Sequence, residues 1–208
     1  MVLRPTLKLT VSNRIRSLML AGAAWLVLIA PALSQTSVYT TLSGPDGGLM
    51  NCETLSAAKA DGEGEWAYLR CPGVGGVDLY IDYADARDTI RVGKDGKGTP
   101  FLPPFTGLGA KAEWRMAGGK PYAMIVRLTL GGIEEYKGQW LTVHHVNATT
   151  GQGCLVGYVD ARANKNANVL ARELADTVGR EGCRTNGPAI SGKMGNAMRE
   201  LIAQKPQG

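Results

Sequence analysis

The sequence predicts an α+β domain, in which a mostly antiparallel sheet of about six or seven strands carries one C-terminal amphipathic helix and two disulfides. Three observations predict this fold class. Short segments rich in β-branched and aromatic residues follow one another with glycine-containing turns between them, as in antiparallel sheets. One segment near the C-terminus has helical periodicity, and the chain contains four cysteines.

Residues 1–34 have the composition of a secretory signal peptide. Four basic residues and no acidic one precede an apolar run at 18–30, and small residues follow at Ala32 and Ser34. This order of basic, apolar and small segments is typical of an export signal. An uncleaved membrane anchor is the alternative, but a bilayer-spanning helix needs about 20 apolar residues. We therefore expect cleavage before Gln35 and no stable membrane span afterwards.

The chain after the signal has the size of one domain and almost no net charge. Removing residues 1–34 leaves 174 residues, with 19 basic and 18 acidic side chains and thus a net charge of +1. We therefore expect no nucleic-acid partner. We assign residues 35–186 to a single disulfide-stapled domain. Residues 187–208 form a polar tail, with a short amphipathic helix or a frayed end as the two alternatives.

All four cysteines lie after the signal peptide. An even number of cysteines in an exported chain indicates disulfides, and four cysteines allow three pairings. We expect Cys52–Cys71 and Cys154–Cys183, because these pairs are close in sequence and are separated by segments that can fold back on themselves. No C-x-x-C pair is present, so we expect no metal site.

The strand assignments follow the β-branched and aromatic residues. Strict alternation at 77–82 places Val77, Leu79 and Ile81 on one face of a half-buried strand. The clearest hairpin turns at Gly118 and Gly119, which provide the positive φ angles of a tight connection. The segments assigned to strands are residues 37–42, 77–82, 112–116, 121–130, 139–146 and 154–159, and the short segments 52–55 and 66–71 can form a hairpin-like unit closed by a disulfide.

Residues 92–110 contain eight glycines and prolines, which predict a long surface loop. This loop carries Phe101 and Phe105. Long loops in compact domains are often functional, so the two rings are candidates for ligand binding. The alternative is that both rings plug the edge of the core.

Residues 164–179 are predicted to form the one clear helix. Apolar residues recur there at steps of three and four, and charged residues lie on the other face. Asn164 or Asn166 can cap its start, and Gly179 or Gly182 can end it. A bond between Cys154 and Cys183 would tie the end of this helix to the preceding strand.

The candidates for catalysis are weak. His144 and His145 are the only histidines, and neighbours on a strand point to opposite faces of the sheet, so they cannot easily serve one metal. One of them could act as a general base oriented by a carboxylate such as Asp160, Glu134 or Glu135. The alternative is that both are structural or solvated, because no nucleophile motif accompanies them.

Three motifs resemble a group of small, exported, uncharacterised bacterial proteins. They are a Cys71-Pro72-Gly73 turn, a strand with Trp114 and Arg115 that enters a Gly119-Lys120-Pro121 hairpin, and residues 153–161 before a helix rich in Asn and Ala. The resemblance covers most of the chain after the signal. It implies export to a bacterial periplasm, and it implies no activity and no catalytic residue.

We therefore expect a non-catalytic, exported periplasmic protein that binds or interacts with a partner. The partner classes we expect are another envelope protein or a glycan, and we expect no cofactor. The alternative is a small periplasmic hydrolase that uses His144 or His145 with a nearby carboxylate. An enzyme should place a histidine beside a carboxylate in a concave pocket, whereas a binding protein should expose an apolar patch.

Overall fold

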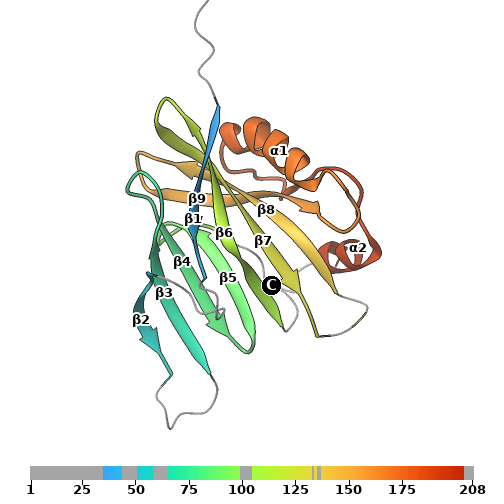
Figure 1. Ribbon diagram of the computed structural model, residues 1–208, viewed down its shortest axis with the longest axis horizontal. Coiled ribbons are helices and arrows are strands. Elements are labelled where there is room, and N and C mark those ends of the chain that lie inside the picture. The colour runs from blue at the N-terminus through green and yellow to red at the C-terminus, as the bar shows by residue number, and fades with distance from the viewer. Residues whose placement is uncertain are drawn as a thin grey trace, which may run out of the picture. The chain divides into compact units, whose positions relative to one another are not determined.

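The structure is a computed structural model that describes residues 35–43, 51–58, 65–98, 105–132, 134 and 137–203 (Figure 1). Contacts divide the chain into two units, Met1–Ala32 and Leu33–Gly208, and all described residues belong to the second. The expected signal peptide, residues 1–34, thus lies outside the described residues. No helix among the described residues is long and apolar enough to cross a membrane.

The described residues form one sheet of ten strands and two helices. The strands follow one another in space as β10-β9-β8-β7-β6-β5-β4-β3-β2, and β1 pairs with β6 outside this path. The strands are β1 (Thr36–Thr41), β2 (Glu53–Ala57), β3 (Trp66–Pro72), β4 (Asp78–Ala84), β5 (Arg87–Val92), β6 (Thr106–Ala117), β7 (Lys120–Leu130), β8 (Gly138–Asn147), β9 (Gln152–Asp160) and β10 (Ala189–Ile190). The helices are α1 (Ala167–Glu181) and α2 (Asn196–Ala203).

The α+β class is confirmed, but the expectation of six or seven antiparallel strands is wrong. The sheet is mixed, because β10 pairs with β9 in parallel and β5 meets β6 in parallel at Arg87 and Thr106. Two strands were missed for physical reasons. β5 has charged residues at half of its positions, and β10 is two residues long and is defined by its partner rather than by its own sequence.

The expected loop at 92–110 is wrong at its C-terminal end, where β6 begins at Thr106. Glycines in this part of β6 permit a close approach of β7, since a Cβ at Gly109 would lie 3.0 Å from the Cβ of Arg127. At the other end, Lys97 donates its backbone N–H to Gly153 over 3.0 Å and accepts one from Leu155 over 2.9 Å. The sheet therefore curves until the segment after β5 reaches β9. Phe101 lies outside the described residues.

The two faces of the sheet are both buried in its central strands. Along β7, Ala123 and Ile125 pack with α1, whereas Met124 and Val126 pack in the core on the other face. This second core continues toward α2 around Trp140. Its largest fully buried side chains include Trp114, Trp140, Leu79, Ile81, Ile90, Met124 and Leu128.

Helix α1 lies on one face of the sheet, as expected, and its buried residues face β7, β8 and β9 (Figure 1). The approach is close, because a Cβ at Gly179 would lie 2.9 Å from the Cβ of Ala123.

Both expected disulfides are confirmed. Cys154–Cys183 joins β9 to the chain after α1, and Cys52–Cys71 joins the start of β2 to β3.

Helix α2 lies within residues 187–208, the expected polar tail, for which a short amphipathic helix was one of the two alternatives. Its Met198 is fully buried against the cluster that contains Trp140 and Tyr158. The strand β10 attaches the preceding segment to the edge of β9. The part of the chain from 189 to 203 is thus packed on the sheet.

Candidate functional site

His144 is buried inside the sheet and lines neither of the two cavities described below. Its Nε2 lies 3.1 Å from Oγ1 of Thr142. Because the Thr142 hydroxyl donates to the carbonyl of Val126, it accepts from Nε2–H, so the proton of the neutral ring is on Nε2. Nδ1 has no hydrogen-bond partner among the described residues. Burial lowers the pKa of His144 to about 3, so the ring is neutral at ordinary pH.

His145 faces the opposite side of the sheet and contacts α1. Its Nδ1 lies 2.6 Å from the carbonyl oxygen of Gly179, so it donates a hydrogen bond to the last turns of the helix. A carbonyl in this position has no partner within the helix, so the contact stabilises the helix end. The ring nitrogen that a catalytic carboxylate would have to contact is therefore already occupied by a structural hydrogen bond.

The structure does not bring Asp160 to either histidine. In the β8–β9 register Asp160 lies opposite Trp140, whereas Leu155 lies opposite His144, about 13 Å further along the strand. The Asp160 carboxylate accepts three backbone hydrogen bonds, from Arg162 at 2.9 Å, Ala163 at 3.0 Å and Gly195 at 2.9 Å. The other carboxylates that were considered are Glu134, which is exposed, and Glu135, which lies outside the described residues.

Asp160 and Asn164 instead hold α2 against the end of β9. Asn164 donates to the carbonyls of Asp160 and Lys193, each over 2.8 Å, and accepts from Lys193 N–H over 2.9 Å. Asp160 binds the N–H of Gly195, which directly precedes α2. These bonds explain why Asn164 does not begin α1, which starts at Ala167. They also fix one wall of a cavity.

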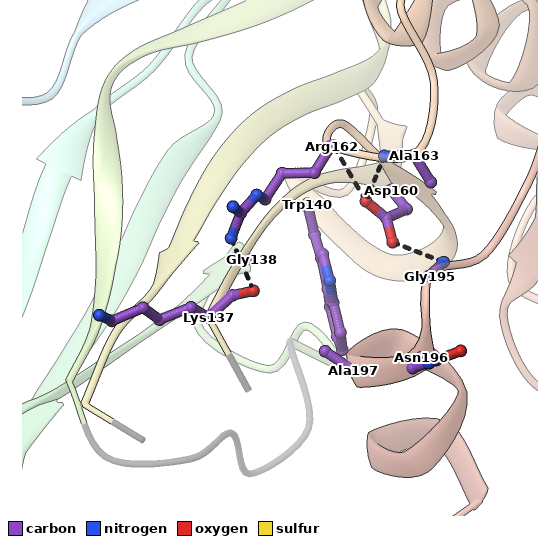
Figure 2. A pocket seen from close by; sticks show the side chains of 9 residues that line it. All are labelled: Lys137, Gly138, Trp140, Asp160, Arg162, Ala163, Gly195, Asn196 and Ala197. Atoms are coloured by element: carbon purple, nitrogen blue, oxygen red, sulfur yellow. Dashed lines mark hydrogen bonds between the residues drawn. The ribbon is translucent and has the colours of Figure 1, made fainter. Parts of the chain in front are cut away.

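This cavity, which we call the Trp140 cavity, has a volume of about 310 Å³ and lies where β8, β9 and α2 meet. In Figure 2, the indole of Trp140 lies between two walls of the cavity. Lys137 and Arg162 form one wall, and the start of α2 forms the other. The lining residues are Lys137, Gly138, Trp140, Asp160, Arg162, Ala163, Gly195, Asn196 and Ala197.

The indole N–H of Trp140 has no hydrogen-bond acceptor among the described residues, and this atom keeps some access to solvent although the side chain as a whole is only 1% exposed. The other fully buried indole differs, because Nε1 of Trp114 donates to Oγ1 of Thr40 over 2.9 Å. A donor that keeps access to solvent can bind either water or an acceptor on a ligand. The ring itself is held edge to face against Tyr158, with 5.6 Å between centroids.

The charges at the Trp140 cavity are largely balanced. Lys137 forms an ion pair with Glu134, and the ammonium group lowers the pKa of this exposed carboxyl. Arg162 donates to the backbone carbonyl of Lys137 over 3.1 Å and forms no ion pair with a described residue (Figure 2). The Asp160 carboxylate is occupied by backbone donors. The cavity therefore offers hydrogen-bond donors without a large excess of positive charge.

The aromatic candidates of the predicted loop do not form a site in the described residues. Phe105 is 62% exposed, and its backbone joins the sheet through hydrogen bonds to Ala86 and Gly131. It therefore does not plug the core. No group of three or more His, Cys, Asp or Glu side chains within the described ranges could hold a metal ion.

Sequence reasoning missed Trp140, Lys137 and Arg162. They lie in separate segments, and their proximity depends on the β8–β9 register and on the bonds of Asp160 to Gly195. The one available signal was Trp140 itself, a large aromatic side chain with a polar atom near the start of a predicted strand. Comparisons of the chain with protein-family models, with curated proteins and with solved structures gave no match.

Proposed function

We propose that this protein is an exported, periplasmic, non-catalytic binding protein and that its ligand occupies the Trp140 cavity. The observation that carries the proposal is the indole N–H of Trp140, a donor on an almost fully buried side chain that lines the cavity and has no acceptor among the described residues. An acceptor on a ligand would bind this N–H in place of water, and a hydrogen bond of this kind contributes about 0.5–1.5 kcal/mol.

The chemistry of the walls limits the ligand. Arg162 and the Trp140 indole are donors, Asn196 adds a side-chain amide, and the ammonium group of Lys137 is paired with Glu134. A volume of about 310 Å³ is near the lower end of ordinary small-molecule sites. The proposed ligand is therefore a small, acceptor-rich molecule, such as one sugar unit of a glycan or a short segment of an envelope component.

Non-catalytic function is favoured over hydrolysis by the contacts of the two histidines. His144 is buried beside Thr142, and His145 donates to the carbonyl of Gly179. Neither lines the Trp140 cavity. No observation in the described residues favours the hydrolase alternative.

Export is supported by the two disulfides, which are typical of proteins that fold in an oxidising compartment. The periplasm itself is proposed from the signal-like composition of residues 1–34. The intact mass of the protein recovered from the envelope tests this part. A mass that starts at Gln35 is expected, and a mass that retains residues 1–34 contradicts cleavage.

Ligand binding is tested by thermal unfolding of the protein with fractions of a small-molecule extract from the envelope of its host. A ligand at 100 times its Kd stabilises the folded state by about 3 kcal/mol, which raises the Tm by roughly 5–10 °C in a domain of this size. Trp140→Phe removes the N–H and keeps most of the ring. We expect this variant to bind the active fraction about tenfold more weakly.

Trp66→Phe is the matched control, because Trp66 is an exposed tryptophan on β3 that lines neither cavity. It should keep the full stabilisation by the active fraction. Equal stabilisation of the wild-type protein and of Trp140→Phe would contradict the proposed site. If no fraction stabilises the wild-type protein, the proposal of a small-molecule ligand is wrong.

A further inference from the structure

A second cavity of about 190 Å³ lies between α1 and the strands β1, β6, β7 and β8. We call it the Arg127 cleft. Its apolar part comes from Ile125 and Leu141, which are each 4% exposed and pack in the core under α1. Its polar part comes from charged side chains of β6, β7 and α1. Apolar and charged groups thus line one small space.

One of the three cations in the cleft is neutralised by the only carboxylate that lines it. Arg172 donates to Glu113 from Nε over 2.6 Å and from Nη2 over 3.2 Å. Ser37 donates to the same carboxylate over 2.6 Å. Burial alone would raise the pKa of Glu113, but these hydrogen bonds hold it below its usual range, so the carboxylate is ionised. Glu113 is therefore committed to Arg172.

The other two cations, Lys111 and Arg127, have no such partner. Neither forms an ion pair with a residue in the described part of the chain. Arg127 donates to the side-chain oxygens of Gln139 at 3.1 Å and Asn168 at 3.2 Å. These neutral amides fix the position of the guanidinium group without compensating its charge. The cleft thus contains three cations and one carboxylate.

We propose that the Arg127 cleft binds a small amphiphilic anion, in which one carboxylate or phosphate group is attached to an apolar group of a few carbon atoms. The anionic group pairs with Lys111 and Arg127, and the apolar group covers the exposed edges of Ile125 and Leu141. Arg127 is already oriented, so binding requires little ordering of its long side chain. This site is separate from the Trp140 cavity, and the two share no lining residue.

The test is a titration of the ¹⁵N-labelled protein followed by amide chemical shifts, with four probes. Benzoate and phenyl phosphate carry the two anionic groups on one ring, benzyl alcohol lacks the charge, and inorganic phosphate lacks the ring. We expect benzoate or phenyl phosphate to shift the amides of Ile125, Leu141 and Asn168. Their Kd should be at least tenfold lower than those of the two partial probes. The better of the two anions identifies the anionic group.

Two variants test the assignment to residues. Lys111→Gln and Arg127→Gln should each raise the Kd of the better probe about tenfold, because each removes one charge-assisted hydrogen bond. Both side chains lie at the surface of the sheet, and an unchanged amide spectrum away from the cleft shows that the fold is kept. Lys120→Gln is the control, since this exposed lysine begins β7 and lines neither cavity. It should leave the Kd unchanged.

Two results would overturn the proposal. If benzyl alcohol shifts the same amides with the same Kd, the cations do not contribute. If the Kd is the same in wild type, Lys111→Gln and Arg127→Gln, the cleft is only a solvated cationic surface. Trp140→Phe should not change the Kd of these probes, so failure of the Trp140 cavity proposal would leave this result intact.

Discussion

His144 is a histidine kept neutral by its surroundings, and this has a consequence for stability. The unfolded chain gives this ring an ordinary pKa near 6.5, whereas burial lowers it to about 3 in the folded protein. Between these two values the unfolded state binds more protons than the folded state. The free energy of unfolding therefore falls as the pH falls from about 6.5 toward 3, and it is unaffected by this residue at higher pH.

We predict that this single group lowers the free energy of unfolding by about 2 kcal/mol between pH 7 and pH 5, at about 1.4 kcal/mol per pH unit below its normal pKa. His144→Leu should remove this part of the pH dependence, because leucine does not titrate and the site is enclosed. The measurement is urea unfolding of both proteins at pH 7 and pH 5. Since other groups titrate alike in both, the difference between the two proteins isolates His144. If the wild-type protein and His144→Leu lose the same free energy of unfolding between pH 7 and pH 5, His144 is not a buried neutral ring.

Residue patterns could predict which cysteines pair, but not the environment of the histidines. The alternation of a strand correctly placed His144 and His145 on opposite faces. It could not indicate that both faces of β8 are covered, because that depends on α1 on one side and on the curvature of the sheet on the other. Asp160 likewise was identifiable as a carboxylate, but its three backbone donors come from tertiary packing.

At the scale of elements, α1 is held by a set of contacts along its whole length. Arg115 forms two hydrogen bonds with Asp176, at 2.8 and 2.7 Å, and Tyr122 also donates to Asp176. Burial alone would raise the pKa of Asp176, but hydrogen bonds from Arg115 and Tyr122 keep it below its ordinary value. Cys183 adds a covalent bond just after the helix. The helix is therefore fixed by apolar, ionic and covalent contacts together.

We predict that the double substitution Cys154→Ser and Cys183→Ser lowers the free energy of unfolding by about 2–5 kcal/mol, as in other small secreted domains. The polar contacts of Asp176 should keep α1 in place, so the fold should persist. Denaturant unfolding gives the energy, and hydrogen exchange should increase most in the last turns of α1.

The matched control is Cys52→Ser with Cys71→Ser, which opens the other disulfide at the far end of the sheet order. It should leave exchange in α1 unchanged. If the Cys154 and Cys183 variant unfolds at the same denaturant concentration as the wild type, the bond does not clamp the helix.

The elements themselves were predictable where their patterns were local. The alternation in β4, the Gly118–Gly119 turn and the periodicity of α1 are each contained in one short, continuous stretch of sequence. The elements that were not predicted depend on partners that are distant in sequence. The first residues of β6 look like a loop because they contain glycines, and only the approach of β7 explains them.

For the whole molecule, the proposed site depends on three segments that the sequence keeps apart. The Trp140 cavity is formed by residues at the start of β8, after β9 and at the start of α2. Asp160 and Asn164 join these segments by hydrogen bonds to backbone atoms near Gly195. Such bonds leave no periodic pattern, so the sequence could predict the domain and its disulfides but not this cavity.

The most direct measurement of the central claim is the ¹⁵N–¹H spectrum of the indole groups, recorded while fractions of the host's envelope extract are added. Trp140→Phe identifies the Trp140 resonance by its disappearance, and Trp114 is an internal control because its N–H already donates to Thr40. The account predicts that the ligand shifts the Trp140 indole proton downfield, as a hydrogen bond forms, while the Trp114 resonance stays in place. A Trp140 indole resonance that remains unmoved by a fraction that stabilises the protein would contradict the account.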